Sequence, residues 1–264
     1  MPSLIGQKQL KHLRKLPFCY ICGKTFHHDD VRDRDHVPPR SCISKHDIMQ
    51  SPLILPTHQA CNGTFKVADE RLGQFLSVLH GKIPKPEHNL LKFEHFYDDL
   101  EKGGYSQVLK SVDMYGAVAR WLKAFHAALY QRPLSPDFKY AIELPLDVGY
   151  LKEGEPTTDT GRPYQRTMCD ERISCNRAIK TIDRIAACNG KLQYECTWFM
   201  GPESAICVFW LEFYQWARLS RINKKQEKEC VGFYIIPIDE LPAQATIASE
   251  LLAHTYKFHF PFEM

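Results

Sequence analysis

Four residues near the N-terminus have the types and the spacing of zinc ligands. Cys19 and Cys22 form a Cys-x2-Cys pair, and His58 and Cys61 form a second pair with the same spacing. Three cysteines and one histidine make an ordinary tetrahedral zinc shell, and zinc binding contributes roughly 10 to 16 kcal/mol in zinc-finger peptides. Because closing the loop between the pairs costs only about 3 kcal/mol, we expect one zinc ion to hold both.

Two alternatives to this ligand set follow from the same residues. His27 or His28 could take the place of His58 as the fourth ligand. The cysteines could also be buried thiols, with His58 capping the helix expected to follow it. The chain contains 10 cysteines and no recognisable secretion signal, so we expect reduced thiols and a cytoplasmic protein. No run approaches the roughly 18 to 20 apolar residues that cross a bilayer, so we expect no membrane association.

The loop between the two zinc pairs carries residues suited to phosphoryl transfer. Asp35 and His36 lie within it, and Asn62 directly follows the last zinc cysteine. Carboxylate and amide oxygens suit a hard divalent ion such as Mg2+ or Mn2+. A histidine, with an ordinary pKa of about 6.5, suits a general base acting on water. Because the zinc clip would bring these three residues together, we expect a catalytic centre beside it.

Basic residues surround these positions and open the chain. The formal net charge is only +3, so the chain as a whole is not a strongly basic nucleic-acid binder. Its first 28 residues nevertheless contain no Asp or Glu, and a local basic segment can hold a phosphate backbone. The candidate phosphate-binding residues are Lys8, Lys11, Arg14, Lys15, Arg34, Arg40, Lys45 and Lys66. A solvated helix face is the alternative explanation of the N-terminal cations.

In combination, these motifs resemble the HNH endonuclease family, which has the ββα-metal nuclease fold. The matching stretches are "CYIC" from Cys19, "DHVPP" from Asp35 and "HQACN" from His58. They span less than a third of the chain. The sequence departs from the family pattern where His58 replaces the usual zinc cysteine, and where no Asn stands near Leu53 to pin the connecting loop.

The resemblance implies a role for each residue of the expected centre. It implies a metal-dependent endonuclease that hydrolyses phosphodiester bonds of DNA. His36 is then the general base, and Asp35 and Asn62 hold the catalytic divalent ion, while the zinc ion is structural. Two other functions stay open: a nuclease that acts on RNA, and a non-catalytic zinc module that binds nucleic acid or protein.

Composition and apolar periodicity predict an α+β protein in two parts. We expect a zinc-clipped HNH domain over residues 1–81, a linker or loop region over 82–106, and an α+β domain with an antiparallel sheet over 107–264. Within the last part, apolar spacing predicts a helix over 113–132, and alternation predicts strands over 191–200, 205–219 and 230–238. The role of this domain is open among substrate selection, a homodimer and a protein partner. Asp69 and Glu70 are expected on a solvated helix face.

Overall fold

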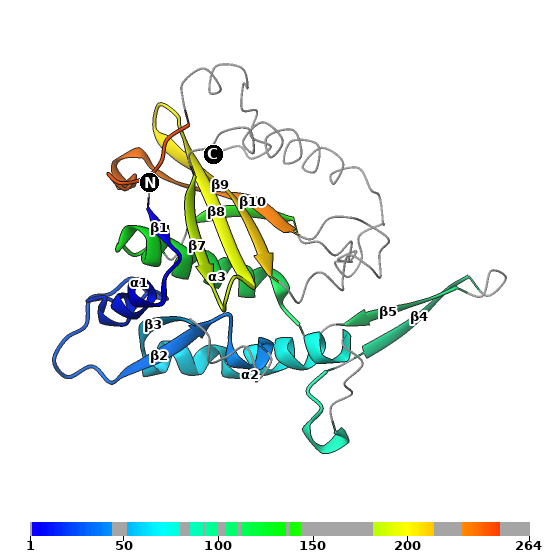
Figure 1. Ribbon diagram of the computed structural model, residues 1–264. Coiled ribbons are helices and arrows are strands. Elements are labelled where there is room, and N and C mark those ends of the chain that lie inside the picture. Colours follow the sequence, from blue (N-terminus) through cyan, green and yellow to red (C-terminus); the bar gives the residue numbers. More distant parts are fainter. Residues whose placement is uncertain are drawn as a thin grey trace.

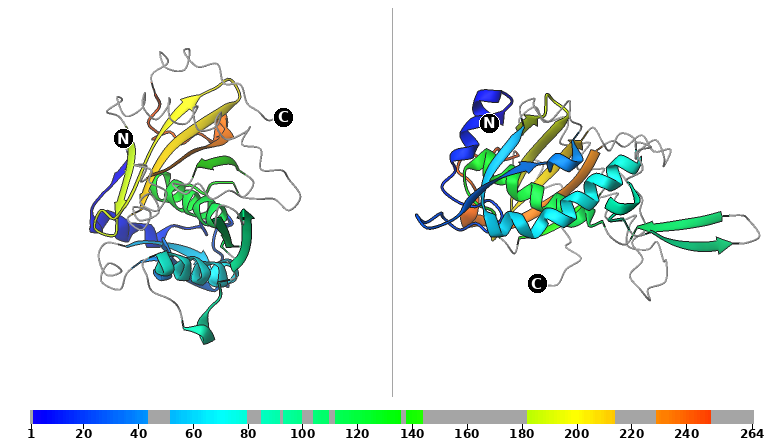
Figure 2. Two further views of the ribbon diagram at one scale, coloured as in Figure 1. Left: turned by 90° about the vertical axis from the view of Figure 1, so that its right-hand side faces the viewer. Right: turned by 90° about the horizontal axis from the view of Figure 1, so that it is seen from below.

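Three layers make up the protein: a six-stranded sheet, helix α3 (Met114–Tyr130) and an N-terminal unit of two strands and a helix (Figures 1 and 2). Helix α3 lies between the other two layers. The structure is a computed structural model and describes residues 2–43, 52–79, 85–91, 93–99, 104–109, 112–135, 138–143, 182–213 and 229–248.

The N-terminal unit has the strand–strand–helix order expected from the sequence. Strand β2 (Arg32–Val37) pairs antiparallel with β3 (Leu53–His58), and α2 (Gln59–Leu79) begins at the next residue. Leu53 and Leu55 are completely buried on one face of β3. Because side chains alternate along a strand, this burial fixes the register of the hairpin and therefore where its polar residues point.

Short elements precede and join this unit. Helix α1 (Gln7–His12) continues into the 3₁₀ turn η1 (Leu13–Lys15), which packs against β3. A second 3₁₀ turn, η2 (Arg40–Cys42), follows β2 and packs against α2. None of the described helices is long and apolar enough to cross a membrane.

The sheet has the strand order β1-β7-β8-β9-β10-β6. Neighbouring strands from β7 to β6 run antiparallel, as the sequence predicted, but the edge strand β1 runs parallel to β7, so the sheet is mixed. Its strands are β1 (Ser3–Leu4), β6 (Lys139–Glu143), β7 (Asp183–Ala187), β8 (Leu192–Met200), β9 (Ser204–Phe213) and β10 (Glu229–Pro237). The first residues of the chain thus join the sheet expected to belong to the second domain.

The predicted helix and strands of the second part are confirmed over the described residues. Helix α3 covers the predicted span closely, and β8, β9 and β10 fall on the three predicted strand segments. The prediction of β9 extended beyond Phe213 to residue 219, and residues 214–219 lie outside the described part. Where a linker was expected, β4 (Phe93–Asp99) and β5 (Gly104–Leu109) form a two-stranded hairpin preceded by the turn η3 (Pro86–His88).

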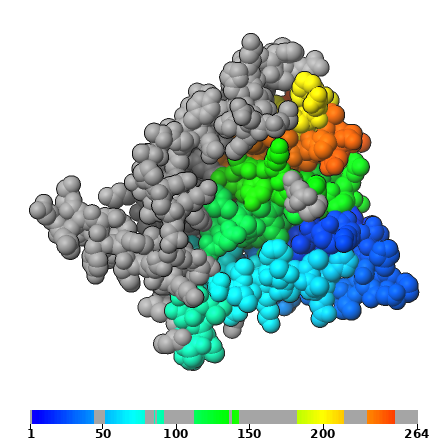
Figure 3. All heavy atoms as spheres, turned by 180° about the vertical axis from the view of Figure 1, so that it is seen from behind, coloured from blue at the N-terminus to red at the C-terminus, as the bar shows by residue number. Residues whose placement is uncertain are grey.

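Helix α3 is buried on most of its circumference because it contacts both neighbouring layers. Toward the sheet, Phe125 stacks on Tyr194 with ring centroids 4.4 Å apart. Toward the N-terminal unit, the Arg120 guanidinium donates to the Asp69 carboxylate of α2. One hydrophobic core runs from Leu10 through α3 into the sheet. Seen from behind, the green middle of the chain lies between the blue and cyan N-terminal part and the orange and yellow C-terminal part (Figure 3).

Candidate metal centre

The first zinc pair lies in a tight knuckle that precedes β2. The Cys19 carbonyl accepts a hydrogen bond from the Gly23 amide at 2.8 Å, and the Cys19 amide donates to the Lys24 carbonyl at 2.9 Å. Gly23 has a positive φ of 77°, which a glycine adopts without the steric penalty that a side chain brings. The knuckle therefore turns both thiols toward the start of α2.

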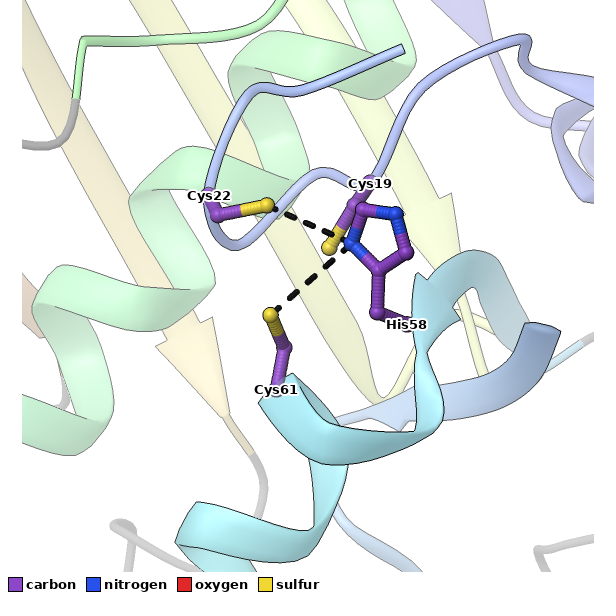
Figure 4. Close-up of side chains that lie close together, drawn as sticks. All are labelled: Cys19, Cys22, His58 and Cys61. Atoms are coloured by element: carbon purple, nitrogen blue, oxygen red, sulfur yellow. Dashed lines mark hydrogen bonds between the residues drawn. The ribbon is translucent and has the colours of Figure 1, made fainter. Parts of the chain in front are cut away.

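The four predicted ligands converge at the junction of the knuckle, β3 and α2 (Figure 4). The ligand atoms of Cys19, Cys22, His58 and Cys61 all lie within 4.8 Å of one another. His58 Nδ1 is 3.4 Å from Cys22 Sγ and 3.9 Å from Cys61 Sγ. A tetrahedral ion with bonds of about 2.3 Å to sulfur and about 2.0 Å to nitrogen places such atoms about 3.5 Å apart. The cluster can therefore hold a zinc ion, which confirms the predicted grouping.

The alternative histidine ligands are not part of this cluster. The His28 side chain is 90% exposed and contacts Asp29, and His27 is also exposed.

The surroundings shift the pKa values of the cysteine thiols in opposite directions. Burial raises the pKa of Cys19, but hydrogen bonds from backbone amides, first that of Cys22, bring it below its usual value. Burial and the neighbouring thiols raise the pKa of Cys61 to about 12. A cation at the centre would favour the thiolate form of every cysteine in the cluster.

Asp30 positions the histidine ligand from its far side. His58 Nε2 lies 3.2 Å from Asp30 Oδ2, which leaves Nδ1 to face the thiols. The same carboxylate oxygen accepts a hydrogen bond from the His27 amide at 2.6 Å, and this bond lowers the pKa of Asp30. A carboxylate on the outer nitrogen of a metal-binding imidazole fixes the ring orientation and strengthens the ligand.

We expect Asp30→Ala to lower the affinity for zinc by about 10- to 100-fold, as the loss of such supporting carboxylates does in other metal sites. Competition with a chelator of known zinc affinity measures the change. The matched control is Asp29→Ala, because Asp29 is the adjacent carboxylate and contacts only the exposed ring of His28 among the described residues. Equal zinc affinity in wild type and Asp30→Ala would contradict the role given to Asp30.

Asp35 points into the protein rather than to the surface. Its side chain is only 6% exposed, and it accepts a hydrogen bond from the hydroxyl of Tyr20, which is completely buried in the knuckle. Burial raises the pKa of Asp35, while the positive charge of Arg120 and the Tyr20 hydroxyl act to lower it. Asp35 therefore ties β2 to the knuckle.

Arg120 is the centre of this buried polar group. It is 4% exposed, donates to Asp69 of α2 and lies over the Phe65 ring, with 4.6 Å between the guanidinium carbon and the ring centroid. Asp69 is therefore mostly buried, and the expectation of a solvated helix face was wrong for it. The charge of Arg120 acts on the buried carboxylate of Asp35 and on the mostly buried carboxylate of Asp69, and its contact with Asp69 couples α3 to the N-terminal unit.

Asn62 contacts a different carboxylate of β2. Its Nδ2 donates to Asp33 Oδ2 at 2.8 Å, and this hydrogen bond is the main cause that lowers the pKa of Asp33. Asp33 is exposed and Asn62 is half-buried in the first turn of α2. The structure thus brings together Asn62 and Asp33, whereas the Asp35 carboxylate is bound inside by Tyr20.

His36 is half-buried on β2 and has an arginine partner. Arg40 Nε donates to His36 Nε2 at 3.1 Å. Burial, the charge of Arg40 and the charge of Arg14 together lower the pKa of His36 to about 4. The imidazole is therefore neutral at neutral pH and can accept a proton. In this arrangement its Nε2 lone pair already accepts the Arg40 hydrogen.

The candidate phosphate-binding residues are mostly on the surface. Lys8, Lys11 and Lys15 of the N-terminal segment are exposed, as are Arg34, Arg40 and Lys66. Arg14 is half-buried. Lys45 lies outside the described residues.

Four residues of the site escaped sequence reasoning: Asp30, Asp33, Tyr20 and Arg120. Asp33 could have been found by its place two positions before Asp35, since both then lie on one face of a strand. Asp30 gives only a weak signal, as one of several acids after the knuckle. Comparison of the chain with protein-family models, curated proteins and solved structures gives no match.

Proposed function

We propose that the protein is a nuclease that hydrolyses phosphodiester bonds, with DNA as the preferred substrate and a structural zinc ion in the Cys19, Cys22, His58 and Cys61 cluster. The observation that carries this proposal is His36 in the zinc-clipped ββα unit. It is a neutral, partly accessible imidazole whose pKa is lowered by burial and by the charges of two arginines, Arg40 and Arg14. Arg40 also donates a hydrogen bond to it. A neutral imidazole can take a proton from water, and guanidinium groups bind phosphate.

The zinc ion in this proposal has a structural role. Its four protein ligands leave no open position for water or substrate, which is the usual distinction between structural and catalytic zinc sites. Bound zinc would hold the knuckle against the first turn of α2. It would thereby fix β2, and with it His36, relative to Asn62.

The divalent ion of the hydrolysis is assigned to Asn62 and a carboxylate of β2. When bound, such an ion would stabilise the negative charge that develops on the phosphate and on the leaving oxygen. Asp35 is the carboxylate implied by the family resemblance. We favour Asp33, because its carboxylate lies at the Asn62 amide and is exposed, whereas the Asp35 carboxylate is buried and accepts from Tyr20. Asp33 and His36 alternate to opposite faces of β2, so this assignment places the substrate phosphate across the edge of β2 that is not paired with β3. The two assignments differ in which variant, Asp33→Asn or Asp35→Asn, should need more divalent ion for cleavage.

The test is a titration of Mg2+ and of Mn2+ against cleavage of supercoiled plasmid and of single-stranded RNA. Divalent ions are removed beforehand with a resin, and zinc content is checked, because a strong chelator in the assay would also remove the structural zinc. Asp33→Asn and Asn62→Ala are expected to need at least about tenfold more ion for half-maximal cleavage, since the first removes the negative charge of one ligand and the second removes the other ligand. Asp35→Asn is expected to lower the unfolding temperature while leaving the metal requirement nearly unchanged.

The variants distinguish the possible outcomes. A metal requirement that shifts for Asp35→Asn but not for Asp33→Asn returns the assignment to Asp35. Cleavage of RNA but not of plasmid makes the protein a ribonuclease. No cleavage of either substrate by the zinc-loaded protein with either ion contradicts the proposal.

A second candidate function is a zinc module that binds nucleic acid without cutting it. It is favoured by the inward position of Asp35 and by the hydrogen bond that Arg40 donates to His36, because both residues then serve structure. This candidate predicts salt-sensitive nucleic-acid binding with no cleavage at any divalent-ion concentration.

A further inference from the structure

We propose that Arg14 and Arg40, near the His36 imidazole, bind one phosphate group of a nucleic acid, and that Arg40 leaves the His36 ring when the phosphate binds. The inference rests on the proposed function, because it names the group that this site takes first and the change that makes His36 available. It assigns to Arg40 two alternative partners, an imidazole nitrogen and a phosphate oxygen.

The backbone of Arg40 is held in place while its side chain is exposed. The next residue, Ser41, donates from Oγ to the Asp69 carbonyl of α2 at 2.7 Å. A Cβ at Gly73 of α2 would lie only 2.5 Å from Ser41 Cβ, so this glycine lets the turn lie directly on the helix. The Arg40 guanidinium can therefore change its partner by side-chain rotation alone, without movement of η2.

Arg14 belongs to a segment that precedes the hairpin in the chain. It belongs to η1, which packs against β3, the strand that pairs with β2. Its Nε is buried and has no hydrogen-bond partner among the described residues. Over the same part of the chain, neither Arg14 nor Arg40 forms an ion pair with an acidic side chain. The charges of both guanidinium groups lower the pKa of the His36 imidazole, and no carboxylate of the described residues pairs with either of them. Such a site favours the binding of an anion.

The geometry of the donors favours phosphate as that anion. A guanidinium presents paired N–H groups that match the oxygens of phosphate, and it stays charged at every physiological pH. Arg34 is exposed and stands two positions before His36, so both residues lie on one face of β2. A row of cations that continues along the strand suits the repeating charge of a nucleic-acid backbone better than a small phosphate metabolite.

The hydrogen bond from Arg40 has a consequence for the proposed base. While Arg40 Nε donates to His36 Nε2, that nitrogen cannot accept a proton from water. When Arg40 instead donates to a phosphate oxygen, the lone pair of Nε2 is free. Binding of the substrate phosphate thus uncovers the base at the place where the phosphate lies.

The test uses the full-length, zinc-loaded protein with ¹⁵N-labelled histidine, observed by NMR without added divalent ions so that nothing is cleaved. The probes are inorganic phosphate and a short DNA duplex, each against chloride at the same ionic strength. Phosphate is expected to move the His36 Nε2 resonance toward the value of a nitrogen without a hydrogen-bond donor. Arg40→Ala is expected to show that value before any phosphate is added.

Affinities from the same titrations give the second readout. Arg14→Ala and Arg40→Ala should each weaken phosphate binding by about tenfold, as expected for one lost charge-assisted hydrogen bond. Lys139→Ala is the matched control, because Lys139 is an exposed cation of β6 and is not among the candidate phosphate-binding residues.

Two results would overturn the inference. One is a His36 resonance that does not respond to phosphate or to Arg40→Ala. The other is a loss of affinity in Lys139→Ala as large as in Arg40→Ala, which shows attraction by net charge only. Phosphate binding as described, together with no cleavage in Mg2+ or Mn2+, supports the phosphate site while the proposed nuclease function fails.

Discussion

Cys61→Ser is expected to abolish zinc binding and to unfold the N-terminal unit. The variant replaces one of four converging ligands by a hydroxyl, which is a poor ligand for zinc. Structural zinc contributes roughly 10 to 16 kcal/mol in small zinc-dependent domains, whereas whole proteins are stable by only about 5 to 15 kcal/mol. Because the hydrophobic core is continuous from this unit into α3, we also expect a lower unfolding temperature for the rest of the protein.

The measurement combines zinc content per chain, thermal unfolding and limited proteolysis of the knuckle. Cys42→Ala is the control, because Cys42 is a buried cysteine that lies outside the metal cluster. It should keep one zinc per chain and lose only the roughly 1 kcal/mol typical of a small core substitution. A purified wild type without zinc, or a Cys61→Ser protein as stable as Cys42→Ala, would contradict the zinc clip.

The zinc cluster could be predicted from sequence because ligand chemistry and spacing specify it directly. Two pairs with the same short spacing leave few other geometries once one ion binds all four side chains. The helix Met114–Tyr130 and the strands Leu192–Met200 and Ser204–Phe213 could be predicted for a similar reason, since their apolar periodicity reflects burial against neighbouring layers.

The partners of individual charged residues could not be predicted in this way. Asp69 meets Arg120 across 51 residues, and Asn62 meets Asp33 across 29. Periodicity shows which face of an element is apolar, but it does not show which charged residue of another layer lies opposite. The parallel pairing of Ser3–Leu4 with β7 was missed because two residues carry no periodic signal.

The position of Asp35 shows the same limit within one motif. The Asp-His string indicated two neighbouring functional groups, but successive side chains of a strand point to opposite faces. Asp35 consequently accepts from Tyr20 inside the protein, while His36 meets Arg40 near the surface. Adjacency in sequence therefore did not establish that both side chains face the same ligand.

His36→Ala is expected to lower the rate of phosphodiester cleavage by at least roughly 100-fold, the lower range for loss of a general base. The substitution removes no zinc ligand and no partner of Asn62, so zinc content and the affinity for divalent ions should stay at wild-type values. The affinity for nucleic acid should change little, because both arginines remain. His28→Ala is the matched control, since His28 is 90% exposed and lies outside the metal cluster.

The most direct test of the nuclease proposal is the single-turnover rate constant for cleavage of a labelled DNA duplex at saturating Mg2+ or Mn2+. It should be measured for wild type, His28→Ala and His36→Ala at equal zinc content. The proposal predicts cleavage at the same rate by wild type and His28→Ala, and at least roughly 100-fold slower cleavage by His36→Ala with unchanged binding. Cleavage by His36→Ala at the wild-type rate would contradict the role of His36 as the general base.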